Sequence, residues 1–465
     1  MLESRAGWRA WLGVSELALC RRLLLAGLGG VYACAFVSLG VQLPGLVGEG
    51  GILPNADFFE AVARAEHLGF MDVPSLCWGA GCSDAALTAL WLAGLAAALM
   101  LVVGVAPLLA APICFVSYLS LVHAGQRFLG FQWDQLLLEA GFLALLLVPA
   151  RAWGPRSVAW RAQPSPAAWL LVRWLLFRLM LSSGAVKLLS GDGTWLELEA
   201  LAYHFETQPL PTLSSWWAHQ APSILLNVAT LATLVLEVGL PFLYWGPRRL
   251  RRFAAVLTLL LMLIIAATGS YGFFNLLAAV LCLSLLEDRD LPARLRGWLL
   301  PAGGIEPSRG RGLSGRAWVA LRGAAVAVLA LLSLVPLFGA LGWEARLPAS
   351  LQASYAGTRG LRIVNNYGLF AHMTTERPEL LVEASLDGRE WRPYEFRWKP
   401  GDLAQAPRAA YLHMPRLDWQ LWFAALRGRP PGWLAPFCAR LLQGRPEVLA
   451  LLEGNPFPDE PPRFV

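Results

Sequence analysis

Four charged side chains interrupt long apolar runs and are the first candidates for chemistry: Glu139, Arg173, Arg178 and Glu237. At about 1.5 Å per helical residue, Arg178 and Glu139 come to similar depths, roughly 16–17 Å from the expected inner ends of their helices. A charge inside a membrane is costly, so it commonly has a function or a partner. Two acids can face two bases here. The pattern predicts a buried ion-pair network in which Arg178 pairs with Glu139 or Glu237, and the alternative is a proton or substrate path.

Hydrolase-like and metal-binding arrangements are missing from the sequence. The 6 histidines are scattered, with no His-x-x-x-His pair, no Gly-x-Ser-x-Gly elbow and no Walker loop. We therefore expect no enzyme activity, no metal and no cofactor. Tyr203, His204 and Glu206 lie close together and could supply a general base. An aromatic loop outside the membrane is more typical of an interfacial belt or a protein-contact surface.

The chain has 7 cysteines, and two of them, Cys77 and Cys82, lie in a polar loop. If that loop lies outside the cytoplasm, a small disulfide between them is one expectation. Most of the other cysteines lie in or beside apolar runs, where a cysteine normally serves as a packing residue.

The elements that must position these residues are membrane-spanning helices. The chain has 465 residues, of which 56% are hydrophobic and 15% charged, whereas soluble domains carry about 25% charged residues. Apolar runs long enough to cross the roughly 30 Å hydrocarbon layer as helices recur along it. We expect nine spans, at 22–43, 84–103, 106–123, 134–150, 167–189, 222–245, 253–268, 271–287 and 317–341.

Basic residues set the expected orientation. The formal net charge is +6, but the arginines cluster beside apolar runs, which indicates membrane topology and argues against nucleic-acid binding. The clusters follow the fourth, sixth and eighth expected spans, at 151–161, 248–252 and 289–316. All three lie inside if the N-terminus is cytoplasmic. The acidic loops 44–83 and 190–221 then lie outside.

The composition changes after residue 342. Residues 1–342 are expected to form the transmembrane domain, and residues 343–465, which are charged and rich in proline, a polar α+β domain outside the cytoplasm. Alternating residues around Asp387-Gly388 predict a β-hairpin with a type I′ turn. Residues 360–370 predict a further strand, and three later segments predict short helices.

Eight stretches, spread in order over nearly the whole chain, resemble the lipase maturation factor family. They are GILP (51–54), FQWDQLLLEAGFLA (131–144), RWLLFRLMLSSGAVKL (173–188), YHFETQPLP (203–211), VNNYGLFAHMTTERPE (364–379), YEFRWKPGD (394–402), PRLDWQLWFAAL (415–426) and NPFPDEPPR (455–463). The resemblance implies a multi-span protein of the endoplasmic reticulum membrane that helps secreted lipases fold and assemble without being an enzyme. A bacterial member would lie in the inner membrane and have another client.

Two other functions remain open at this point. One is a membrane enzyme or carrier that uses the buried Glu and Arg residues, and the other is a purely structural membrane subunit. Under the maturation-factor hypothesis the partners are a secreted lipase-like client and membrane lipids. The candidate client contacts are then aromatic and charged residues of the 190–221 loop and of residues 343–465, the C-terminal tail. They are Tyr203, His204, Glu206, Tyr367 and Trp419.

Overall fold

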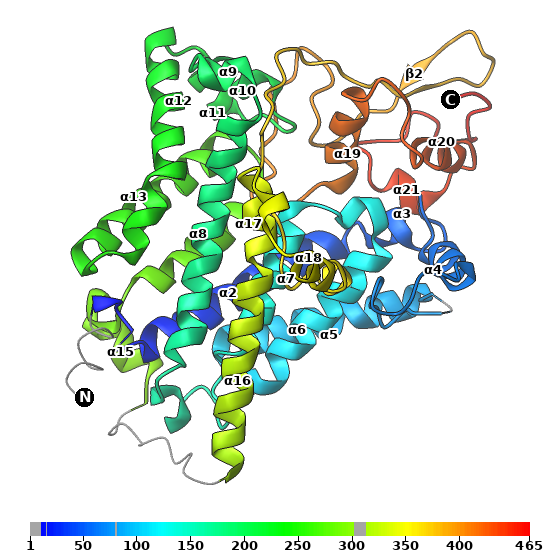
Figure 1. The fold of residues 1–465 in the computed structure, drawn as a ribbon. Coiled ribbons are helices and arrows are strands. Elements are labelled where there is room, and N and C mark those ends of the chain that lie inside the picture. The colour runs from blue at the N-terminus through cyan, green and yellow to red at the C-terminus, as the bar shows by residue number, and fades with distance from the viewer. Residues whose placement is uncertain (1–10, 15, 80, 302–312) are drawn as a thin grey trace.

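The structure is a computed structural model that describes residues 11–14, 16–79, 81–301 and 313–465 (Figure 1). Long helices dominate it. They are α2 (Ala18–Gly40), α5 (Asp84–Val103), α6 (Pro107–Ala124), α8 (Pro166–Leu189), α12 (Ser223–Val238), α13 (Arg248–Thr268) and α16 (Leu313–Leu332). The apolar segments continue from α12 through η3 (Leu240–Trp245) and from α16 through α17 (Leu334–Ala340). The described residues thus contain 7 helices long and apolar enough to cross a membrane.

The expected count of nine spans is therefore not confirmed. The fourth apolar run forms α7 (Gln132–Leu145), with only 14 residues, about 21 Å of helix. The eighth forms α14 (Phe274–Leu281) followed by η4 (Cys282–Leu285). Most of α7 is buried inside the protein. A short helix surrounded by protein is as apolar as one surrounded by lipid, so composition alone could not separate the two cases.

Local capping explains where several long helices begin and end. The Ser83 side chain accepts a hydrogen bond from the Ala86 N–H at the start of α5. Gly104 ends that helix at φ +77°, a left-handed conformation suited to glycine. Asp288 accepts hydrogen bonds from the Leu19 and Cys20 N–H groups, which caps the first turn of α2. Packing then brings α2 against α5, α5 against α6, and α8 against α12.

The connections between the long helices contain short helices. They are α3 (Leu43–Val47), α4 (Asn55–Arg64), η1 (Gln126–Leu129), η2 (Val158–Arg161), α9 (Gly193–Leu196), α10 (Ala200–Thr207), α11 (Leu213–His219), η5 (Asp288–Asp290), α15 (Ala293–Leu299), η6 (Glu344–Arg346), α18 (Ala349–Ala356) and η7 (Arg359–Leu361). The loop expected at 190–221 is thus largely helical.

The polar C-terminal region is mostly helix and irregular chain. Its three expected helices are present as α19 (Arg416–Ala425), α20 (Leu434–Leu442) and α21 (Pro446–Leu449). The hairpin is present but small, because β1 (Glu383–Ala384) and β2 (Arg392–Pro393) have two residues each. Asp387 Oδ1 accepts hydrogen bonds from the N–H groups of Arg389 and Glu390. These bonds form a wider turn than the predicted type I′ turn and end the ladder early.

The predicted strand at 360–370 is wrong. Its backbone bonds to side chains of a helix instead: the Asn365 N–H donates to Glu139 Oε2 (2.8 Å) and the Gly368 N–H to Gln132 Oε1 (3.0 Å). A segment whose donors are used in this way cannot also form a ladder.

Residues on both sides of the expected boundary at 342 share one hydrophobic core. Trp133 of α7 packs against Trp419 of α19, with ring centroids 4.8 Å apart. Figure 1 shows α19, α20 and α21 grouped with α3 and α4, on the side of the molecule away from the N-terminus. The polar region is therefore fixed to the helical bundle by direct packing.

Candidate functional site

The candidate site is a groove between the 190–221 loop and the C-terminal tail. On the loop side, Thr212 and Ser215 form a capping box that starts α11. This cap orients the helix that carries Trp216, which lines the groove and is 50% exposed. On the tail side, the groove is lined by the continuous segment 395–403. The groove encloses about 610 Å³.

Hydrogen bonds fix the two sides of the groove to each other. The Arg377 guanidinium donates to the carbonyl oxygens of Glu206 (2.8 Å), Gln208 and Pro209 (3.2 Å), at the end of α10. The Trp422 indole N–H donates to the Thr207 carbonyl (2.9 Å). Carbonyls at a helix C-terminus lack helical partners. The tail supplies those partners, so loop and tail form one surface.

Charges of both signs line this groove. Glu206 is exposed and lies 3.6 Å from His219, measured from Oε2 to Nε2. Across the groove, Arg408 pairs with Glu453 at 2.8 Å. Trp216 lines the same groove, so this surface combines an exposed apolar side chain with charged ones. That combination is common at protein-binding surfaces.

The five expected contact residues do not share one environment. Glu206 is the member of this set that lies exposed in the groove. Tyr203 is half-buried, and the His204 ring stacks with Tyr271, whose hydroxyl lies 3.0 Å from its Nε2. Burial lowers the pKa of His204 to about 4, so the ring is neutral at neutral pH.

Tyr367 and Trp419 are corrections to the expected contact set. Each is only 3% exposed. Their aromatic character reflects packing inside the shared core, and neither presents a surface to a partner in this structure.

The buried charges also differ from the expected network of four. Arg178 donates to Glu139. Glu237 pairs instead with Lys187, at 2.5 Å. Arg173 donates to the carbonyl oxygens of Ser284 (2.8 Å) and Leu12 (2.7 Å) and forms no ion pair among the described residues. Lys187 was not among the four predicted charges, because it lies near the end of its expected span. It is part of the stretch RWLLFRLMLSSGAVKL (173–188).

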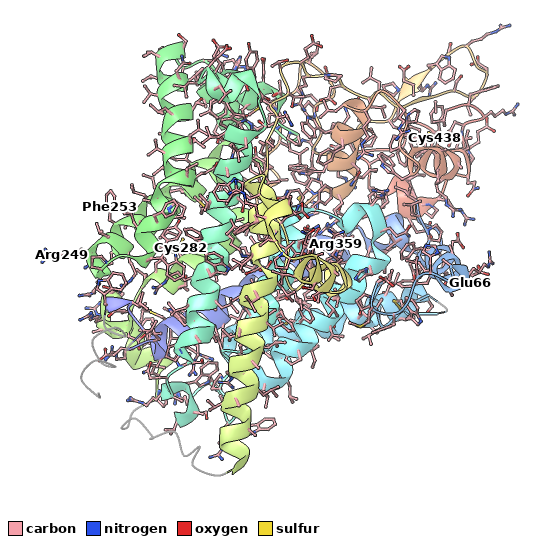
Figure 2. All side chains as sticks on the ribbon, in the orientation of Figure 1. Glu66, Arg249, Phe253, Cys282, Arg359 and Cys438 are labelled. Atoms are coloured by element: carbon pink, nitrogen blue, oxygen red, sulfur yellow. A yellow bond between two sulfur atoms is a disulfide. The ribbon has the colours of Figure 1, made fainter. Side chains whose placement is uncertain are left out.

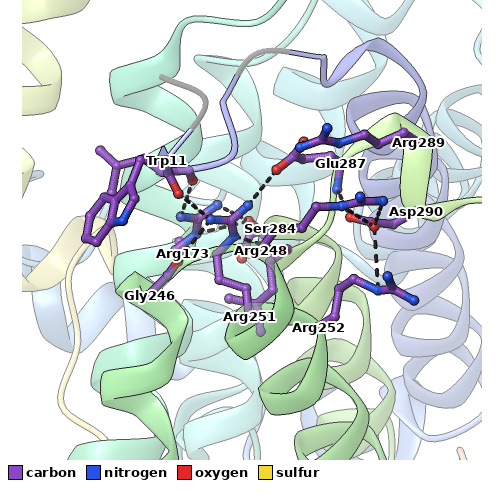
Figure 3. A network of polar contacts seen from close by, with 12 residues as sticks. Trp11, Arg173, Gly246, Arg248, Arg251, Arg252, Ser284, Glu287, Arg289 and Asp290 are labelled. Carbon is purple, nitrogen blue, oxygen red and sulfur yellow. Dashed lines mark hydrogen bonds and ion pairs between the residues drawn. The ribbon is translucent and has the colours of Figure 1, made fainter. Parts of the chain in front are cut away.

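A second ionic cluster joins the start of α13 to residues 287–290 (Figure 3). Arg251 pairs with Glu287 at 2.5 Å, and Arg248 pairs with Asp290 at 2.5 Å. Arg289 reaches the other oxygen of Glu287 at 2.8 Å. The arginine cluster was interpreted only as a topology signal, yet Arg251 is fully buried. The signal that could have revealed the pairing is the acidic triplet spanning 287–290.

Cys77 and Cys82 are joined by a disulfide. Among the described residues no group of three or more His, Cys, Asp or Glu side chains is arranged to hold a metal ion.

Comparison with known proteins now gives the family. Residues 19–293 match the lipase maturation factor transmembrane domain, and residues 363–465 match the lipase maturation factor C-terminal domain. The chain belongs to the lipase maturation factor family. This confirms the resemblance seen in the eight sequence stretches.

Relatives in the lipase maturation factor family align over nearly the whole chain. Lipase maturation factor 2 of Gallus gallus is 35% identical, covering 96% of this chain and 76% of the relative. The human protein of the same name is 34% identical, over 96% and 78%. Lipase maturation factor 1 of Bos taurus is 32% identical, over 99% and 85%. No solved structure matches.

Two buried carboxylates, Glu139 and Asp134, join the two matched lipase maturation factor domains. Glu139 contacts Arg178 within the transmembrane domain, and it also accepts from the Asn365 N–H (2.8 Å) and the Tyr367 hydroxyl (2.7 Å) of the C-terminal domain. One carboxylate thus serves both domains.

The second carboxylate, Asp134, pairs with Arg416, and this pair was not predicted from the sequence. Arg416 of α19 donates to both oxygens of Asp134, each at 2.8 Å. Tyr118 donates to the same carboxylate at 2.5 Å. Asp134 sits in the first turn of a helix expected to cross the membrane, and Arg416 lies 282 residues away. Nothing local in the sequence relates them.

Proposed function

We propose that this protein is a membrane-bound folding and assembly factor for secreted lipases or similar secreted proteins, and that it is not an enzyme. The observation that carries the proposal is the groove shared by loop and tail, with Trp216 exposed in it. Relatives at 32–35% identity are named as maturation factors. The proposed client is therefore a secreted lipase-like protein that binds the groove while it folds.

The acids inside the bundle do not favour the alternative of an enzyme or carrier. Glu139 and Glu237 each contact a cation, so neither is a free acid or base. We propose that they stabilise the fold that presents the groove.

A Trp216→Ala variant tests the proposed function. Tryptophan at the centre of an interface is a frequent hot spot whose truncation costs about 2 kcal/mol or more. We expect the variant to accumulate normally, because Trp216 is half exposed, while the yield of active secreted lipase falls severalfold. The measurement is lipase activity in the secreted fraction, relative to the membrane abundance of the variant.

Trp217→Ala is the matched control for that experiment. Trp217 is the adjacent residue, is 65% exposed and does not line the groove. We expect it to support normal yield. A normally abundant Trp216→Ala variant with full lipase yield would exclude the groove from client binding.

We further propose that the N-terminus is cytoplasmic and that residues 343–465 lie outside, in the endoplasmic reticulum lumen of a eukaryote or the periplasm of a bacterium. This orientation, with Arg249 on the cytoplasmic side, requires the two shorter apolar helices, α7 and α14, to cross the membrane together with the 7 longer ones. Single cysteines at two exposed positions, Arg249 and Arg389, test this orientation. Cys438 is partly exposed, so the background chain carries Cys438→Ser. A membrane-impermeant maleimide applied to intact cells, or to sealed vesicles with the lumenal face outward, should label position 389 and spare position 249. The reverse pattern would reject the orientation.

A further inference from the structure

A second cavity lies beside the joint between the two domains, apart from the groove. It encloses about 480 Å³, and its walls come from α7, α8, α17, α18 and residues 362–368. The segment VNNYG, prominent in the sequence but absent from the groove, lines it. Figure 2 labels Arg359, one of its basic residues, beside α18.

The charges of this cavity are unbalanced. Two guanidinium groups, Arg359 and Arg362, line it together with one acid, Glu344. Among the described residues, none of these three side chains forms an ion pair. The other charges nearby, Arg178 and Glu139, neutralise each other. The cavity therefore carries a net positive charge with no assigned protein counter-ion.

Arg362 is held in an unusual way. Its Nε is buried without a hydrogen-bond partner among the described residues, which is uncommon for a charged donor. Its backbone adopts φ +54°, a left-handed conformation that is rare for residues other than glycine and costs free energy. Burial is the main cause lowering the pKa of Arg362, and the nearby charge of Arg359 adds to it. An anion between the two guanidiniums would offset the desolvation of Arg362 and its repulsion by Arg359.

The apolar part of the cavity indicates the source of that anion. Val186 near the end of α8 and Val335 and Pro336 of α17 form one wall. Val186 lies in α8, and Val335 and Pro336 lie in the apolar segment formed by α16 and α17. Both segments are long and apolar enough to span a membrane, and each reaches the cavity at its C-terminal end. The wall thus lies at the ends of two expected spans, where lipid headgroups are expected, next to two arginines that can bind phosphate oxygens in a forked geometry.

We propose that this cavity binds an anionic phospholipid, whose phosphate lies between Arg359 and Arg362 and whose acyl chains follow α8 and α17. The same segment that carries Arg362 also holds Asn365 and Tyr367 against Glu139. A bound lipid would therefore stabilise the joint between the two domains. This site is separate from the groove, so the inference does not depend on the proposed client.

The experiment measures lipid-dependent thermal stability of the purified full-length protein in a mild neutral detergent. The probes are short-chain phosphatidylglycerol, phosphatidylcholine of the same chain length, and inorganic phosphate. We expect phosphatidylglycerol to raise the unfolding midpoint in a saturable way, with little effect from the other two. An Arg359→Gln/Arg362→Gln variant should bind at least about ten-fold more weakly, as expected for the loss of charge-assisted hydrogen bonds.

Arg346→Gln is the matched control, because Arg346 is an exposed arginine of the same region that contacts Trp343 and does not line the cavity. It should keep the full lipid response. The double variant should unfold at the wild-type midpoint without lipid, since Arg362 has no ion pair to lose. An equal lipid response in wild type and double variant, or a loss of response in the control, would overturn the proposal. A shift produced by inorganic phosphate at the same concentration would overturn the lipid as its source.

Discussion

Replacing Asp134 with alanine is expected to lower the free energy of unfolding by about 3–5 kcal/mol, because it leaves the buried Arg416 guanidinium without its counter-ion. The side chains of Arg416 and Asp134 are 1% and 0% exposed. Arg416 would retain the carbonyl of Phe128 as a strong acceptor, which does not balance its charge. Chemical unfolding in mixed detergent micelles measures the change.

A double variant separates the loss of the ion pair from the loss of packing. Asp134→Leu with Arg416→Met replaces both charges by apolar side chains of similar size. Such exchanges are commonly neutral or even stabilising, so we expect the double variant to be more stable than Asp134→Ala alone. If the stability lost in the double variant equals the sum of the losses in Asp134→Leu and Arg416→Met alone, the pair does not act as a coupled unit.

Replacing Glu139 with alanine should produce the second large effect, of similar size, together with a local one. The carboxylate accepts from Arg178, from the backbone and side chain of Asn365, and from the Tyr367 hydroxyl. Its removal leaves a buried cation and several donors without partners. We expect a loss of about 3–5 kcal/mol and a release of the 362–368 segment from the bundle. Hydrogen exchange should show faster exchange of the amides at 363–368.

Glu60→Ala is the control for Glu139→Ala. Glu60 also pairs with an arginine, Arg64, but the two side chains are 62% and 73% exposed. Exposed pairs contribute about 0–1 kcal/mol, so the control should leave both stability and exchange at 363–368 nearly unchanged. Additive effects in a double-mutant cycle of Glu139 with Arg178 would contradict the pairing.

The sequence was sufficient to predict a helical, polytopic membrane protein and its family. Membrane-spanning helices need long apolar runs, and such runs are visible without knowing what surrounds them. The short helices of the tail were also predictable, because helix ends follow local signals such as Gly444, which lies just beyond α20 at φ +60°. The eight stretches shared with the family were specific because they are long and occur in order.

Local patterns failed where a segment's partners are distant in the chain. Residues 360–370 have the composition of a strand, yet their donors bond to Glu139 and Gln132. The expected span at 134–150 forms a helix of only 14 residues, α7, which is enclosed by protein. In both cases the surroundings, and not the segment itself, determined the structure.

The sequence by itself determined that buried charges exist in an apolar chain and that they need partners. Only the tertiary structure decided which partners they have: Glu139 with Arg178 and Asn365, Glu237 with Lys187, and Asp134 with Arg416. The physical reason is that an ion pair requires two groups within a few ångströms of each other. That proximity depends on the rotation and depth of packed helices, and it brings together residues up to 282 positions apart.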